Sequence, residues 1–281
     1  MDIKVRRNGF QKGPHPLQVI SWCVILFNIF TSVVVILPLL ETHQKVTFKQ
    51  IIFCCIFYTS QVWVVFLGYS ITASDPTDPI SVQKDPPGKG IAMCSICAVA
   101  VNSNSKHCAQ CNRCVDDFDH HCKWLNNCIG KQNYRKFIAL IICLECNLLC
   151  YFGFCLGGVI SYYRDSESFE EKEWIVSSGV KIGLLWFMVL DSFVFSVANA
   201  NLIGFHTYLK FKGLSTFDYI LQKRSKKPKP KFYAEVSPKK QTIETKLDNT
   251  STLINCTPAD CKSPNDLSNI SPRDPYKETQ V

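Results

Sequence analysis

Four long apolar runs divide the chain of 281 residues, and stretches rich in polar and charged residues separate them. The runs extend over residues 17–40, 51–73, 137–163 and 182–205. Each reaches the roughly 20 residues that a helix with a rise of about 1.5 Å per residue needs to cross a bilayer. One such run is compatible with a buried helix of a water-soluble protein, but four together leave no amphipathic helices to cover them. The pattern predicts an all-α polytopic membrane protein with four transmembrane helices.

The distribution of Lys and Arg predicts how these helices are oriented, because basic residues accumulate on the cytosolic side of a membrane. Residues 1–16, residues 74–136 and the chain after residue 205 are rich in Lys and Arg, whereas the two short loops between the runs are poor in them. We therefore expect both termini and the long loop to face the cytosol and the two short loops to face the lumen. The expected location is a membrane of the endoplasmic reticulum or Golgi.

The same boundaries predict the domain organisation. Residues 1–16 form a cytosolic N-terminus, residues 17–73 hold helices 1 and 2, residues 74–136 form the cytosolic loop, and residues 137–205 hold helices 3 and 4. Residues 206–222 mix apolar and charged positions as an interfacial helix does. Residues 223–281 are rich in Lys, Ser, Pro, Thr and Asn, which predicts a disordered tail. Its first basic residues follow a membrane exit, which favours contact with anionic lipid over binding to nucleic acid.

Cysteine usage indicates metal chemistry in the long loop. Of the 16 Cys in the chain, seven lie between residues 74 and 136, together with three His. An odd number of Cys cannot pair completely within the loop, and a cytosolic loop is kept reduced. Repeated Cys-x2-Cys pairs close to His are typical of structural zinc sites. Two four-ligand sites would use eight of the ten groups, and the spacing alone leaves open which eight, or whether all ten serve structure.

The run Asp119-His120-His121-Cys122 resembles the Cys-rich domain of the DHHC-type protein S-acyltransferases, also called palmitoyltransferases. The resemblance covers the loop from Cys94 to Phe137 and includes Cys128 and Asn133. It implies a small domain with two structural zinc ions between helices 2 and 3. The implied ligands of one zinc are Cys94, Cys97, His107 and Cys114, and those of the other are Cys108, Cys111, His121 and Cys128.

The resemblance assigns the remaining pair, His120 and Cys122, to catalysis. A thiol becomes a good nucleophile as a thiolate, and a neighbouring imidazole oriented by a carboxylate, here Asp119, can supply that form. The implied reaction has two steps: long-chain acyl-CoA, the co-substrate, acylates Cys122, and the acyl group then passes to a cytosolic cysteine of a membrane-associated protein. The alternative is a membrane scaffold with little or no activity that binds signalling partners. A zinc-finger ubiquitin ligase is less favoured because it gives no role to His120 and Cys122.

Basic residues near the reactive pair are candidates for contacting the phosphates of CoA, and they are Lys106, Arg113 and Lys123. Trp124 is a candidate marker of the membrane interface. Most members of the family have Pro directly after the reactive cysteine. Lys123 therefore places this chain in a subgroup with Lys at that position.

Three further elements complete the resemblance. Asp75-Pro76 follows the second run and Ser215-Thr216-Phe217-Asp218 follows the fourth, as related motifs do in the family, and we expect them and Asn133 to support the active loop structurally.

The chain ends Glu-Thr-Gln-Val, which resembles a ligand of PDZ domains. In that interpretation Thr279 and the carboxylate of Val281 would bind such a partner.

Overall fold

The computed structural model describes residues 5–11, 13–36, 48–83, 91–166 and 178–226. In chain order its elements are α1 (Pro16–Thr31), η1 (Ser32–Ile36), α3 (Phe48–Ala73), η2 (Ile80–Val82), β1 (Ile91–Cys94), β2 (Val99–Asn102), β3 (Lys106–Cys108), β4 (Arg113–Val115), β5 (His120–Cys122), β6 (Asn127–Ile129), α4 (Tyr134–Arg164), α6 (Ser178–Lys212) and α7 (Thr216–Ser225). Residues up to Arg224 form one compact unit, and that unit contains the candidate site.

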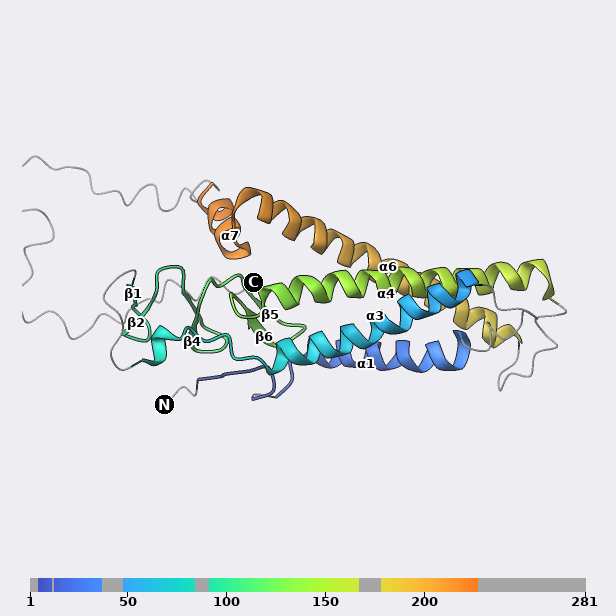
Figure 1. The fold of residues 1–281 in the computed structure, drawn as a ribbon, viewed down its shortest axis with the longest axis horizontal. Helices are drawn as coiled ribbons and strands as arrows, with labels where there is room; N and C mark the ends of the chain where they lie inside the picture. The colour runs from blue at the N-terminus through green and yellow to red at the C-terminus, as the bar shows by residue number, and fades with distance from the viewer. Residues whose placement is uncertain (1–4, 12, 37–47, 84–90, 167–177, 227–281) are drawn as a thin grey trace, which may run out of the picture. The chain divides into compact units, whose positions relative to one another are not determined.

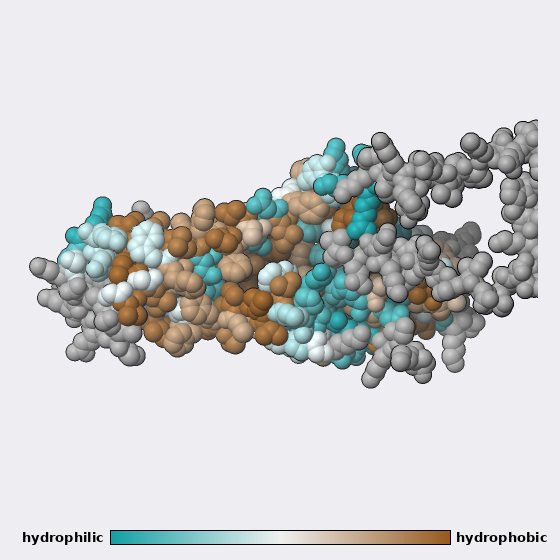
Figure 2. All heavy atoms as spheres, turned by 180° about the vertical axis from the view of Figure 1, so that it is seen from behind, coloured by the Kyte–Doolittle hydropathy of each residue, from teal (hydrophilic) through white to brown (hydrophobic). Residues whose placement is uncertain are grey.

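Four of these helices are long and apolar enough to cross a membrane, as the sequence predicts. The spans are Pro16–Val34, Gln50–Ala73, Tyr134–Arg164 and Gly179–Lys212. Figure 1 shows the long helices side by side, with the β-hairpins gathered at one end of them. Figure 2 shows apolar surface over the helices and more hydrophilic surface over the hairpin end. This separation of surfaces fits helices in lipid and a loop in water.

The fourth helix differs from its predicted limits. It continues to Lys212, whereas the sequence placed the end of the span at residue 205 and an interfacial helix over residues 206–222. The helix ends where Gly213 adopts a left-handed conformation with φ of 64°, which glycine reaches without steric cost. The expected interfacial helix is therefore divided between the last turns of α6 and the short helix α7.

The helices pack through apolar side chains, with a few polar contacts between them. Phe57 of α3, Tyr151 of α4 and Met188 of α6 are fully or almost fully buried in one cluster. Between α4 and α6, the carboxylate of Glu145 accepts hydrogen bonds from Ser196 Oγ at 2.6 Å and Asn199 Nδ2 at 2.8 Å. Such a bond satisfies a carboxyl group that lipid would leave without a partner.

The loop between α3 and α4 is made of three antiparallel hairpins, β1–β2, β3–β4 and β5–β6. Each is very short, and a two-stranded hairpin of this size is not stable alone in water. The turns after Cys97 and Cys111 place Ala98 and Asn112 at positive φ, 54° and 49°. A left-handed residue at this point reverses the chain directly after each Cys-x2-Cys pair. The first two hairpins therefore present their Cys-x2-Cys pairs at tight turns, which suits metal binding.

Polar side chains attach this loop to the end of α3. Asn127 is completely buried, and its Nδ2 donates to the carbonyl oxygens of Ile71, Thr72 and Ser74 at 2.8, 3.3 and 2.9 Å. Its Oδ1 accepts from Arg113 Nη2 at 2.6 Å. One side chain thus completes the hydrogen bonding of the carbonyls at the C-terminal end of α3 and fixes β6 against that helix.

Candidate active site and zinc centres

The Cys and His of the loop form two sets that interleave along the chain. Antiparallel pairing places His107 opposite Cys114 in β3–β4 and His121 opposite Cys128 in β5–β6. Each such pair meets the Cys-x2-Cys turn of the preceding hairpin. The resulting sets are Cys94, Cys97, His107 and Cys114, and Cys108, Cys111, His121 and Cys128. These are the two sets that the resemblance implied, and each one joins two successive hairpins.

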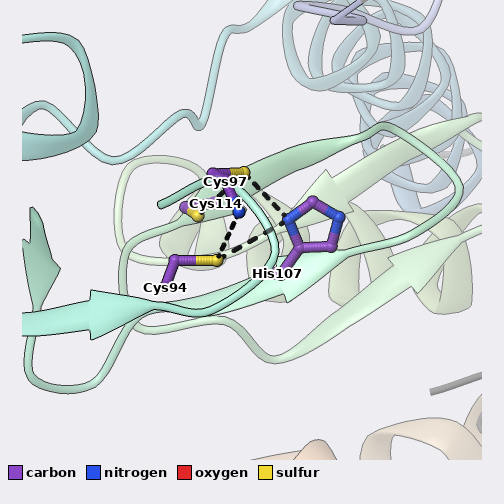
Figure 3. Close-up of side chains that lie close together, drawn as sticks. All are labelled: Cys94, Cys97, His107 and Cys114. Carbon is purple, nitrogen blue, oxygen red and sulfur yellow. Dashed lines mark hydrogen bonds between the residues drawn. The ribbon is translucent and has the colours of Figure 1, made fainter. Parts of the chain in front are cut away.

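The geometry of both sets fits tetrahedral zinc. In the first, the sulfur of Cys97 lies 3.3 Å from Nδ1 of His107 and 3.8 Å from the sulfur of Cys114. Figure 3 shows these side chains converging, with one ring nitrogen of His107 turned toward the sulfurs. Zinc–sulfur bonds of about 2.3 Å and zinc–nitrogen bonds of about 2.0 Å give tetrahedral edges of roughly 3.5–3.8 Å.

The second set has the same dimensions. His121 Nδ1 lies 3.4 Å from the sulfur of Cys111 and 3.6 Å from that of Cys128, and the two sulfurs are 3.5 Å apart. Three thiolates and one imidazole are a common ligand set of closed structural zinc sites. The donors thus suit two zinc ions with a structural role.

The β5–β6 hairpin separates the candidate zinc ligands from the candidate catalytic pair, His120 and Cys122. Successive side chains of a strand point to opposite faces, so His120 and Cys122 share one face while His121 lies on the other. His121 can therefore join the zinc set while its two neighbours remain free of it. Nδ1 of His120 lies 2.7 Å from Oδ2 of Asp119, and the electrostatic interaction with Cys122 contributes to raising the pKa of the imidazole. The imidazole is thus placed between a carboxylate and a thiol.

Asp119 is held at the N-terminus of α7. Thr216 donates to its carboxylate twice, from the backbone N–H at 2.9 Å and from the hydroxyl at 2.8 Å. The hydroxyl of Ser215 accepts from the N–H of Asp218 at 3.0 Å and donates to its carboxylate at 2.7 Å, which caps the helix. A helix N-terminus stabilises a carboxylate through its free N–H groups and its dipole. The motif after the fourth span therefore orients Asp119.

These contacts shift the protonation of the Asp119–His120 pair. Burial opposes ionisation of Asp119, but the hydrogen bonds from His120 and Thr216 outweigh it and lower the pKa of the carboxyl. Burial also acts to lower the pKa of His120, yet its interactions with Asp119 and Cys122 raise it to about 9. The geometry therefore favours a carboxylate beside an imidazolium at neutral pH.

Cys122 lies at the junction of the loop and the membrane helices. It is buried in an apolar cluster that includes Ile71 of α3, Ile129 of β6, and Phe137 and Ile141 of α4. A thioester formed there would direct an acyl chain toward the apolar ends of α3 and α4.

The two remaining motifs lie beside the site without touching Cys122. The carboxylate of Asp75 accepts from Arg113 Nη1 at 3.2 Å, and Pro76 follows it as the chain leaves α3. Asn133 is completely buried, and its Nδ2 donates to the carbonyl of Cys128 and to Ser74 Oγ, both at 3.0 Å. Both motifs thus connect the loop to the end of α3.

Arg113 differs from its predicted role as a phosphate-binding residue. Its side chain is 1% exposed and donates to the carbonyl of Arg7, to Asp75 and to Asn127. Its guanidinium is therefore committed to interactions within the protein, because every charge-assisted bond would have to be replaced before it could bind CoA. Lys106 and Lys123 are partly exposed and Trp124 is exposed, so these three remain accessible.

Sequence reasoning missed three residues of this region, Gly9, Asn127 and His206. Gly9 lies so close to the β5–β6 turn that a Cβ there would come within 2.6 Å of the carbonyl oxygen of Leu125. His206 of α6 is buried beside His120, and their ring centroids are 5.9 Å apart. A titratable residue directly after the fourth apolar run was a signal that could have pointed to His206. Gly9 and Asn127 carried no such signal, because their roles depend on contacts between distant segments.

The predicted PDZ ligand, with Thr279 and Val281, lies outside the described residues, as does the predicted disordered tail (residues 223–281) from residue 227 onward. Both stay predictions of the sequence. The first residues of that predicted tail differ from the expectation, because α7 continues to Ser225.

Comparison with known proteins supports the family. Residues 89–223 match the family model described as DHHC palmitoyltransferase. The chain is 28% identical over 257 residues to Palmitoyltransferase ZDHHC1 of Mus musculus, covering 78% of this chain and 51% of the relative. It is 39% identical over 155 residues to Protein S-acyltransferase 18 of Arabidopsis thaliana, covering 51% of this chain and 30% of the relative. The chain thus spans about half or less of the length of these relatives. Residues 89–223, with their two Cys/His clusters and Asp-His-His-Cys run, match the DHHC palmitoyltransferase family.

Proposed function

We propose that this protein is a protein-cysteine S-acyltransferase that uses Cys122 as its nucleophile. The observation that carries the proposal is the placement of Cys122, which lies beside the Asp119–His120 pair and within an apolar cluster at the ends of α3 and α4. Thiol activation and acyl-chain burial are the two requirements of the reaction, and this position serves both.

In the first step, the thiolate of Cys122 attacks the carbonyl carbon of a long-chain acyl-CoA. The bond between that carbon and the sulfur of CoA breaks, and the departing CoA thiolate takes a proton from the imidazolium of His120. The raised pKa of His120 suits this role, because it keeps the proton on the ring until the leaving group needs it. Asp119 fixes the ring by accepting a hydrogen bond from Nδ1–H of His120.

In the second step, the thiol of a substrate cysteine gives its proton to His120 and attacks the acyl carbon on Cys122. The thioester bond to Cys122 breaks and its thiolate is restored. The sum of the two steps is transfer of one acyl group from the CoA thiol to a protein thiol. A membrane-associated substrate with a cytosolic cysteine fits, because its thiol must reach a site at the membrane boundary.

The zinc ions would be structural. Held by the two sets of four ligands, they would brace the hairpins so that β5 keeps its position, and no proton or acyl group would pass through them. The distribution of Lys and Arg supports a cytosolic location for this loop and both termini. The membrane we propose is that of the endoplasmic reticulum or Golgi. The cytosolic side of that membrane is where acyl-CoA is available.

The first test is intact-mass detection of a thioester on purified protein in detergent with palmitoyl-CoA. We expect an adduct of acyl mass that neutral hydroxylamine removes. Cys122→Ser should abolish it, whereas Cys146→Ser, at an exposed cysteine of α4, should retain it. A folded, zinc-replete wild type without an adduct would contradict the proposal and favour the scaffold.

A further inference from the structure

His206 is a buried titratable residue that the two-step reaction does not use. It lies in the last two turns of α6 and is 3% exposed. Donor atoms of His206, Asp119 and His120 all lie within 4.8 Å of one another. Because α6 joins the site from a part of the chain far from the loop, this contact exists only in the folded protein.

Three rings meet at this point. The ring centroid of His206 lies 5.2 Å from that of Phe137, at an interplanar angle of 67°, and 5.9 Å from that of His120. Phe137 also meets His120 edge to face, at 5.2 Å and 71°. Such edge-to-face arrangements are the favourable geometry for aromatic rings. The ring of His120 therefore packs between Phe137 of α4 and His206 of α6.

A polar contact defines the orientation of His206 itself. The hydroxyl of Tyr134, one turn before Phe137, lies 3.4 Å from Nδ1 of His206. This distance is long for a hydrogen bond, so packing between the rings contributes most to the position of His206. The contact with Tyr134 sets the direction of the His206 ring. Tyr134 and Phe137 both belong to the start of α4. His206 is therefore the residue through which α6 contacts the His120 ring.

The orientation of the His120 ring depends on packing contacts of this kind. Its hydrogen bond with Asp119 comes from the adjoining residue, and it leaves the ring faces unconstrained. Misplacement of a catalytic group by about 1 Å can reduce a rate by about 100-fold. We infer that His206 is a positioning residue, whose ring holds the imidazole of His120 in line between Asp119 and Cys122. The inference rests on the proposed function.

The test compares His206→Ala, His206→Phe and His206→Asn in the full chain, with Asn201→Ala at an exposed position of α6 as the control. The readouts are zinc content, the rate of Cys122 thioester formation at saturating palmitoyl-CoA, and KM for palmitoyl-CoA. We expect His206→Ala to lower the maximal rate by about 10- to 100-fold with KM and zinc content unchanged. Phe keeps the ring and should retain most of the rate, whereas Asn keeps a polar atom without the ring and should be as slow as Ala.

A second readout separates this inference from the proposed function. The rate at which iodoacetamide alkylates Cys122 near neutral pH reports on the His120–Cys122 pair without acyl-CoA, and it should fall in the Ala and Asn variants. A wild type that alkylates rapidly at Cys122 but forms no thioester would refute the proposed function alone. A zinc-replete Ala or Asn variant with wild-type rates in both assays would overturn the positioning role. So would a Phe variant as slow as Ala, because a ring would then be insufficient. If His206→Ala loses zinc, the rates of the other two variants decide. A Phe variant that is faster than the Asn variant supports the positioning role, and a Phe variant that is no faster overturns it.

Discussion

The apolar cluster formed by the hairpins alone is small, whereas the helices on either side of them bury large side chains against one another. The cluster within the hairpins consists of Cys108, Cys111, Val115 and Cys128, three of which are candidate zinc ligands. The helix cluster contains Phe57, Tyr151, Leu185 and Met188. Packing of many apolar contacts tolerates the loss of one, but a hairpin of three-residue strands depends on each ligand and each buried hydrogen bond. Sensitivity to substitution should therefore be concentrated in the loop.

The largest expected effect comes from the zinc sets. Cys128→Ser should remove one of the two zinc ions and lower thioester formation by at least about 100-fold, because β5 loses the ligand pair that fixes it. Metal analysis together with the intact-mass assay would show this. Cys122→Ser is the matched control, since it should lose the thioester and keep both ions. Full zinc content in Cys128→Ser would contradict the assignment.

Gly9 tests whether the N-terminal segment belongs to the loop. Its N–H donates to the carbonyl of Thr72 at 2.7 Å, and Asn126 Nδ2 donates to its carbonyl at 3.0 Å. Gly9→Ala would force a Cβ against Leu125, which should destabilise this contact by about 1–3 kcal/mol and reduce the rate roughly tenfold or more. Gly13→Ala, where nothing lies within 4 Å, should match wild type in thermal midpoint and rate. Equal behaviour of the two variants would show that the segment does not support the site.

Thr216 tests the support of Asp119 by α7. Thr216→Val removes the hydroxyl bond to Asp119 and leaves the backbone bond, so we expect the rate of thioester formation to fall about tenfold, or about 1.4 kcal/mol. Thr207→Val is the control, because its exposed hydroxyl bonds only within α6 to the carbonyl of Ile203. An unaffected Thr216→Val would assign the support to the backbone N–H alone.

The raised pKa of His120 predicts a pH-dependent stability. Its folded pKa, about 9, exceeds the ordinary value of 6.5, so its contribution is complete below about 6.5 and is lost as pH rises through about 9. The thermal midpoint of wild type should fall between neutral pH and pH of about 9.5 more than that of His120→Phe. Parallel curves for the two proteins would refute the shift.

The smallest effect is expected within the helices. Ser196→Ala removes one of the two bonds to Glu145, and Asn199 still donates to that carboxylate. We expect the free energy of unfolding to fall by about 0.6 kcal/mol and the rate of thioester formation to stay unchanged. A large loss of activity would show that this network reaches the site and would break the contrast between loop and helices.

Much of the fold was predictable because membrane helices and zinc turns have local signatures. A run of about 20 apolar residues and a Cys-x2-Cys pair can each be read without knowing what lies next to them. Helix ends were less predictable: α6 continues past residue 205 because Gly213, and not the first polar residue, terminates it. The burial of Arg113 was not predicted, because a basic residue looks the same in sequence whether it binds phosphate at the surface or is buried within the protein.

The sequence by itself determined that four segments favour lipid over water, that the loop holds ten potential ligands, and that Asp119, His120 and Cys122 stand together. Only the tertiary structure decided which distant groups meet them. Thr216 reaches Asp119 and His206 reaches His120 across about 90 residues of chain. The physical reason is that composition and spacing determine the preference of a segment for its environment, whereas the orientation of a catalytic side chain depends on rings and donors that folding brings from other segments.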